Sequence, residues 1–171
     1  MNTATRYGNY CALITIVLIL ILHYSGVSDF WVKGASSIIS SFTEIAFIFL
    51  AIYFTRQKEY SGYIDFRAAA KAGMTMILVN AILFSFFQYI YYRFVDPDFM
   101  NNFVPEYEKW SKLTGKSDAE IKKLSNLISE GFTPISAAWS SFSQMLFIET
   151  FIALIAARIL RRDPPQQQST E

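Results

Sequence analysis

The stretch SSIISSFTEIAFIFLAI, residues 36–52, decides the fold, because a related stretch follows one hundred positions later as SAAWSSFSQMLFIETFI, residues 136–152. Seven residues are identical at this offset, and Glu44 of the first copy is matched by Gln144 of the second. Each copy lies in an apolar run of about 20 residues or more, which is the length that crosses a bilayer as a helix. The copies therefore predict two membrane-spanning helices, each with a polar residue near mid-depth.

The whole chain is rich in apolar residues, which make up 53% of its 171 positions. Its charges are crowded into connecting segments, so four long stretches are almost uncharged. We expect an all-α, polytopic membrane protein that forms one domain over residues 1–162, with an uncleaved first span. The polar tail, residues 163–171, is expected to be disordered and cytoplasmic. The predicted spans are residues 8–24, 35–55, 66–94 and 134–157.

Several classes of protein are disfavoured by composition and motifs. The net charge of +1 provides no basic face for nucleic acid. The single cysteine, Cys11, excludes a disulfide framework and a CxxC metal site. There is no nucleophile–base signature and no phosphate-binding glycine loop. We therefore expect no enzyme activity, no cofactor, and no catalytic or metal site.

The distribution of basic residues predicts the orientation of the spans. Arg6, four basic residues within residues 56–71 and three at the end of the fourth span lie on one side of the predicted membrane. The positive-inside rule places both termini and this middle connection in the cytoplasm. The segment between the third and fourth spans, residues 96–132, is then extracytoplasmic.

That extracytoplasmic segment is expected to form an amphipathic helical hairpin. Asp96 is predicted to cap its first helix, with Pro97 at the first helical position. Ser117 and Glu120 have the spacing of a capping box, which predicts the start of its second helix. Apolar residues recur at helical spacing in both halves, so the hairpin is expected to lie on the membrane surface or over the end of the bundle.

With this topology the second and fourth spans run in the same direction, which predicts two parallel two-helix repeats. Small hydroxyl residues let helices approach closely and hydrogen-bond across their contact. Glu44 and Gln144, at matching positions of the repeat, are expected to hydrogen-bond to each other. The predicted helix-packing face consists of Ser37, Ser41, Ser140 and Ser141.

Polar residues inside a membrane are costly, and each is a candidate functional residue. Here they form a candidate intramembrane polar site of Glu44, Gln144, Glu149 and Asn80. One hypothesis makes the two glutamates a proton- or cation-handling pair, with Asn80 as a helper. The alternative is that these groups only hold the helices together by hydrogen bonds.

Two segments resemble a known family. They are SGYIDFRAAAKAG, residues 61–73, which leads into the third span, and YIYYRFVDPDF, residues 89–99, which leaves it. Together with the four-span layout, they resemble a bacterial family catalogued as domain-of-unknown-function family 4199. The resemblance implies a bacterial inner-membrane protein with four helices, and it assigns no functional residue. It also implies an envelope-biogenesis partner such as a polyprenol-phosphate glycosyltransferase.

Three functions follow as hypotheses. The first is a non-enzymatic protein that scaffolds or assists another envelope membrane protein. The second is a small proton- or cation-linked transporter or channel that uses Glu44 and Glu149. The third is an accessory protein that binds lipid or polyprenol through the aromatic outer hairpin. All three place the chain in a lipid bilayer and allow it to form a homo-oligomer.

Overall fold

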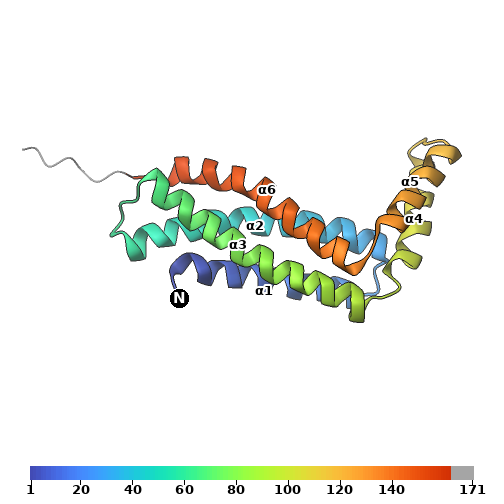
Figure 1. Cartoon of the computed structure of the whole chain (residues 1–171), viewed down its shortest axis with the longest axis horizontal. Coiled ribbons are helices and arrows are strands. Elements are labelled where there is room, and N and C mark those ends of the chain that lie inside the picture. Colours follow the sequence, from blue (N-terminus) through green and yellow to red (C-terminus); the bar gives the residue numbers. More distant parts are fainter. Residues whose placement is uncertain (163–171) are drawn as a thin grey trace, which may run out of the picture.

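Four long helices run side by side in the computed structural model of the chain, which describes residues 1–162 (Figure 1). All four are long and apolar enough to cross a membrane, as the sequence predicted. The predicted disordered tail, residues 163–171, lies outside the described residues. Within residues 1–162 the only strand-like pairing is one isolated bridge. The four helices are α1 (Thr3–Tyr24), α2 (Asp29–Glu59), α3 (Phe66–Ile90) and α6 (Pro134–Leu160).

Helix α2 is longer than predicted at both ends. It begins at Asp29 rather than near residue 35, and it ends at Glu59 rather than near residue 55. Gly34 was expected to belong to the connection between the first two spans, but it lies inside the helix. A single glycine in a helix costs only about 1 kcal/mol, so it does not end one that has an apolar face to bury.

Helix α3 is the central helix of the bundle, because it contacts α1, α2 and α6. Helix α1 lies against α2 and α3, whereas the longest interface of α6 is with α3. Small residues allow two of the close approaches. A Cβ atom on Gly73 of α3 would lie 3.0 Å from the Cβ atom of Ala153 in α6, and one on Gly8 of α1 would lie 2.7 Å from the backbone oxygen of Met76.

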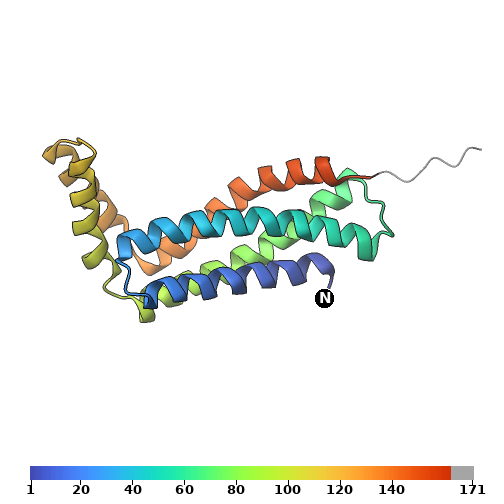
Figure 2. The ribbon, with the colours of Figure 1, turned by 180° about the vertical axis from the view of Figure 1, so that it is seen from behind.

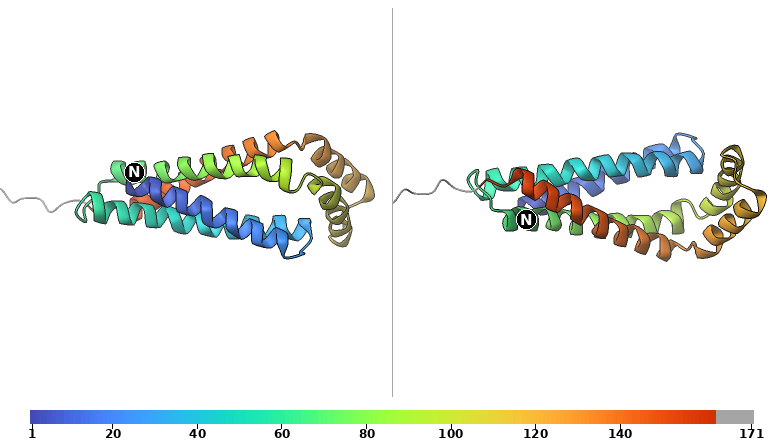
Figure 3. Two further views of the ribbon diagram at one scale, coloured as in Figure 1. Left: turned by 90° about the horizontal axis from the view of Figure 1, so that it is seen from below. Right: turned by 90° about the horizontal axis from the view of Figure 1, so that it is seen from above.

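The bundle is closed at one end and splayed at the other. Figure 3 shows two pairs of helices, α1 with α2 and α3 with α6, which diverge toward the end that carries the hairpin. At the opposite end, the backbone N–H groups of Ile64 and Arg162 each donate to the carbonyl of the other residue at 2.9 Å. This bridge ties the α2–α3 connection to the end of α6. The N-terminus lies at the same end (Figure 2).

The segment between α3 and α6 forms the expected helical hairpin, with α4 (Phe99–Leu113) against α5 (Asp118–Gly131). The predicted capping box of Ser117 and Glu120 is confirmed at the start of α5. The hairpin lies across the splayed end of the bundle (Figure 1). Its position on the outer side of a membrane remains a prediction.

The predicted start of α4 was wrong. Asp96 does not cap it, because α4 begins at Phe99 with Asp98 at the N-cap position and without a side-chain capping bond. Instead α3 continues into a π-helical turn, η1 (Tyr91–Val95). The Asp96 N–H donates to the Tyr91 carbonyl at 2.8 Å and so ends that turn.

The two-repeat organisation also remains a prediction. Helices α2 and α6 run in the same direction, as Figures 1 and 2 show. The packing around them is not symmetric, however. In two equivalent repeats, α1 with α2 and α3 with α6, the contact of α2 with α3 would be matched by one of α6 with α1. Helix α2 does pack against α3, but α6 has no comparable interface with α1 in the described part of the chain.

Candidate functional site

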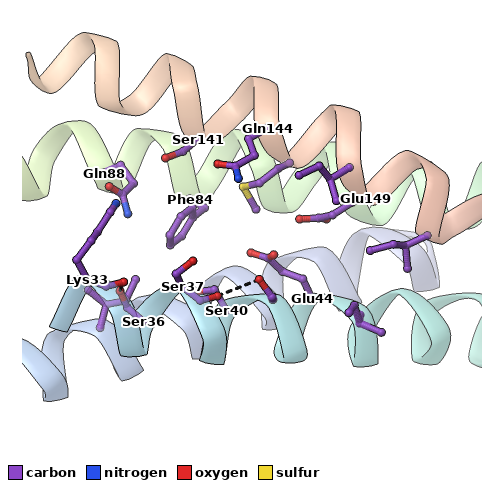
Figure 4. A pocket seen from close by; sticks show the side chains of 16 residues that line it. Lys33, Ser36, Ser37, Ser40, Glu44, Phe84, Gln88, Ser141, Gln144 and Glu149 are labelled. Carbon is purple, nitrogen blue, oxygen red and sulfur yellow. Dashed lines mark hydrogen bonds between the residues drawn. The ribbon is translucent and has the colours of Figure 1, made fainter. Parts of the chain in front are cut away.

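A polar cavity of about 290 Å³ lies between α2 and α6, with side chains from α3 at its base (Figure 4). It occupies the space between the two diverging helix pairs. Most of its polar lining comes from α2. The polar residues that line it are Lys33, Ser36, Ser37, Ser40, Ser41, Glu44, Gln88, Ser141, Gln144 and Glu149.

The face of α2 that lines the cavity is set by helical spacing. Lys33, Ser37, Ser41 and Glu44 follow one another at intervals of three or four residues, so their side chains share one side of the helix. The Ser41 hydroxyl donates to the Ser37 carbonyl at 2.9 Å, which satisfies it within the helix. The serines therefore give the cavity a polar wall without a bond to α6.

Glu44 and Glu149 face each other at the inner end of this cavity (Figure 4). The expected pair of Glu44 with Gln144 is not formed, since no hydrogen bond joins these two side chains in the described structure, and the carboxyl group that interacts with Glu44 is that of Glu149. The two glutamates occupy equivalent positions along their helices. Glu44 and Glu149 each lie fifteen positions after the first residue of their helices, Asp29 and Pro134.

The carboxyl pair is buried but incompletely satisfied. Glu149 is 3% exposed and Glu44 is 9% exposed. Neither oxygen of Glu149 has a partner of good hydrogen-bond geometry within residues 1–162. Two ionised carboxyl groups repel each other strongly in a medium of low dielectric constant, so a proton or cation placed between them is favoured.

The other end of the cavity is basic. Lys33 Nζ lies 3.3 Å from the hydroxyl of Tyr92, to which it donates, and Gln88 of α3 lines the cavity beside it. Glu44 lies eleven positions after Lys33 on α2, which corresponds to about 16 Å along the helix. Lys33 was not predicted as a lining residue. Lys33 lies four positions before Ser37, and this helical spacing could have placed it on the same face of α2 as the predicted residues.

The serines of the predicted packing face do not lie in a close contact between helices. Ser37, Ser41 and Ser141 line the cavity, and Ser140 is exposed outside it. Close helix contacts are made instead by glycine and alanine, as at Gly73 on α3. The Ser41 hydroxyl is bonded within its own helix, so it needs no partner on α6.

The predicted polar site is brought together only in part. Glu44, Gln144 and Glu149 all line the cavity, although Gln144 is exposed. Asn80 of α3 does not line it. Asn80 is 1% exposed, and both polar atoms of its side chain lack a hydrogen-bond partner within residues 1–162. The expected role of Asn80 as a helper of the glutamates therefore has no direct contact to support it.

Comparison with known families agrees with the resemblance of the two segments around α3. A family model described as "Protein of unknown function (DUF4199)" matches residues 6–162. The chain belongs to this family. The match covers the hairpin of this DUF4199 protein and its four long helices, except the first three residues of α1. No curated protein matches the chain. No solved structure matches it either.

Proposed function

We propose that this DUF4199 protein is a small proton- or cation-linked transporter or channel in which Glu44 and Glu149 bind the ion. One observation carries the proposal. Two buried carboxyl groups from different helices face each other at the inner end of a polar cavity. Buried acids in membrane helices are costly, and they commonly mark an ion or proton path.

The surroundings of the pair support access from one side only. Toward the hairpin end, the cavity wall is polar as far as Lys33. Toward the closed end, α2 continues with Ile48 and Ile52, and α6 continues with Ala153 and Ala156, all of which are 0% exposed. An ion could reach the carboxyl pair through the cavity, but it could leave on the other side only after these helices move apart. This is the arrangement that an alternating-access protein requires.

Ion flux into proteoliposomes tests the proposal. Vesicles that hold the purified protein and an internal pH-sensitive dye are given a membrane potential, and proton entry is compared with the entry of Na⁺ or K⁺ reported by ion-selective dyes. We expect flux above that of empty vesicles, and a reduction of at least about tenfold in Glu149→Gln, since a neutral amide cannot exchange a proton or balance a cation.

Glu130→Gln is the matched control, because Glu130 is an exposed carboxylate on α5. Circular dichroism of each variant verifies that the helices are intact. Wild-type protein that conducts none of the three ions, or a Glu149→Gln variant with undiminished flux, contradicts the proposal.

A second candidate is a non-enzymatic scaffold for another envelope membrane protein. It is favoured by Ser140, which is exposed on α6 outside the cavity and is not covered by another helix of the described chain. Small hydroxyl residues on a membrane-facing surface are suited to contact with a further helix. The scaffold predicts that Glu44→Gln leaves function intact, and co-purification of one membrane protein from mildly solubilised membranes tests it.

A further inference from the structure

We propose that a groove on the lipid-facing side of α3 and α6 binds an acidic phospholipid, whose phosphate group is held by Arg67 and Lys71. This groove is separate from the cavity between α2 and α6, and the two share no lining residue. The proposal therefore stands whether or not Glu44 and Glu149 bind an ion.

The groove has a volume of about 760 Å³ and is basic at one end only. Helix α3 forms most of it, and Leu146 and Thr150 of α6 form the opposite wall. The Thr150 hydroxyl already donates to the Leu146 carbonyl at 2.5 Å, so it is satisfied within its own helix. Met74 and Leu78 line the rest of the groove and are 47% and 46% exposed. In a membrane such a surface is covered by acyl chains.

Arg67 and Lys71 lie one helical turn apart in the first two turns of α3, so their side chains project on the same side. Neither forms an ion pair within residues 1–162, where the single salt bridge is that of Lys112 with Asp118. Other basic residues at this end of the bundle lie over aromatic rings, as Arg162 does over Tyr63. No such ring contact holds Arg67 or Lys71 in the described structure.

The carboxylate nearest in sequence does not neutralise this pair. Asp65 is the N-cap of α3, and its side chain accepts a hydrogen bond from the Ala68 N–H at 2.7 Å. The first turn of α3 itself contains no acidic residue. The start of a helix also has a partial positive charge, which adds to the attraction for an anion. The basic end of the groove is therefore complementary to a phosphate group.

The length of the groove favours a phospholipid over a free anion. From Arg67 to Leu78 the helix rises by about 16 Å, which is close to half of a hydrocarbon core of roughly 30 Å. A lipid with its phosphate at Arg67 and Lys71 can thus lay an acyl chain along the groove to the middle of the bilayer. Basic pockets between membrane helices bind acidic head groups in this way.

Lipid titration by native mass spectrometry tests the site. The detergent-purified full chain is titrated with phosphatidylglycerol and, separately, with phosphatidylcholine of the same acyl chains. We expect tighter binding of phosphatidylglycerol. The variant with both Arg67→Gln and Lys71→Gln is expected to bind it about 30-fold more weakly, which corresponds to roughly 1 kcal/mol for each basic residue, and to bind phosphatidylcholine as the wild type does.

Three controls distinguish lipid binding in the groove from binding elsewhere on the protein and from binding of phosphate alone. The double variant Lys122→Gln, Lys123→Gln removes the same charge from α5 and is expected to leave phosphatidylglycerol binding unchanged. Exchanging the two basic types, Arg67→Lys with Lys71→Arg, is expected to retain it. Inorganic phosphate at the same concentration is expected not to compete, because it gains nothing from the apolar part of the groove.

Four results would overturn the proposal. They are equal affinity for the two lipids, undiminished phosphatidylglycerol binding by the double variant at Arg67 and Lys71, an equal loss in the α5 control, and full competition by inorganic phosphate. A disulfide-linked dimer formed through Leu78→Cys in native membranes would also overturn it, because a second copy of the chain would then occupy the groove.

Discussion

The contact between α1 and α3 provides the sharpest test of the packing. Gly8 is buried where α1 packs against α3. A Cβ atom added there would lie 2.7 Å from the Met76 backbone oxygen and 2.8 Å from Val79 Cβ. Both neighbours are rigid, since one is backbone and the other is the branch point of a β-branched side chain. Gly8→Ala can therefore be accommodated only if α1 moves away from α3.

Gly34 supplies a matched reference for this change. It lies within α2, and a Cβ atom added there has no neighbour within 4 Å in the described structure. Glycine to alanine within a helix gains about 1 kcal/mol from backbone propensity. That gain is common to both variants, and overpacking at Gly8 costs about 1–3 kcal/mol. We therefore expect Gly8→Ala to be less stable than Gly34→Ala by about 1–3 kcal/mol.

Unfolding by increasing mole fraction of sodium dodecyl sulfate in mixed micelles, followed by tryptophan fluorescence, measures this difference. A Gly8→Ala protein as stable as Gly34→Ala would refute the close packing of α1 on α3.

Two further predictions concern side-chain hydrogen bonds at the ends of helices. Hydrogen bonds from the Ser117 hydroxyl and N–H lower the pKa of Glu120. The stabilisation of α5 by Glu120 is therefore complete above the ordinary glutamate pKa of about 4.3, and it is lost as the pH falls through the lowered pKa. Hydrogen exchange in the first turn of α5 between about pH 6 and about pH 3 measures this, and Glu120→Gln should remove the dependence. Arg56 donates from its guanidinium group to the Leu160 carbonyl at 3.0 Å, so Arg56→Gln is expected to cost about 1.5–3 kcal/mol in detergent unfolding. Lys58→Gln, which removes an exposed charge from the same turn, should cost less; equal losses would contradict the role of the hydrogen bond.

Local signals account for the parts of the fold that were predicted correctly. The four apolar stretches predicted the long helices, because about 20 apolar residues have no other stable arrangement in a bilayer than a helix. Ser117 and Glu120 predicted the start of α5, because both halves of a capping box lie within four residues. The start of α4 was predicted incorrectly from Asp96. No sequence pattern indicated the π-helical turn that ends at Asp96, and this turn moves the start of α4 to Phe99.

The sequence identified three of the polar residues that line the cavity, but it did not show which of them face each other. Glu44, Gln144 and Glu149 stand out in any sequence of this kind, since each is a polar residue within an apolar run. The offset of one hundred positions paired Glu44 with Gln144. The structure pairs it with Glu149, because the packing of α2 and α6, and not the numbering, decides which residues face each other.

The sequence by itself determined that this protein has four helices long and apolar enough to cross a membrane, together with a capped helical hairpin, since those features depend on residues close together in the chain. Only the tertiary structure decided that the serine face of α2 lines a cavity, that Lys33 belongs to it, and that Arg67 and Lys71 lie at the end of a groove with α6. These arrangements depend on how helices far apart in the chain pack against one another. Close contacts such as that of Gly73 with Ala153, between residues eighty positions apart, determine this packing.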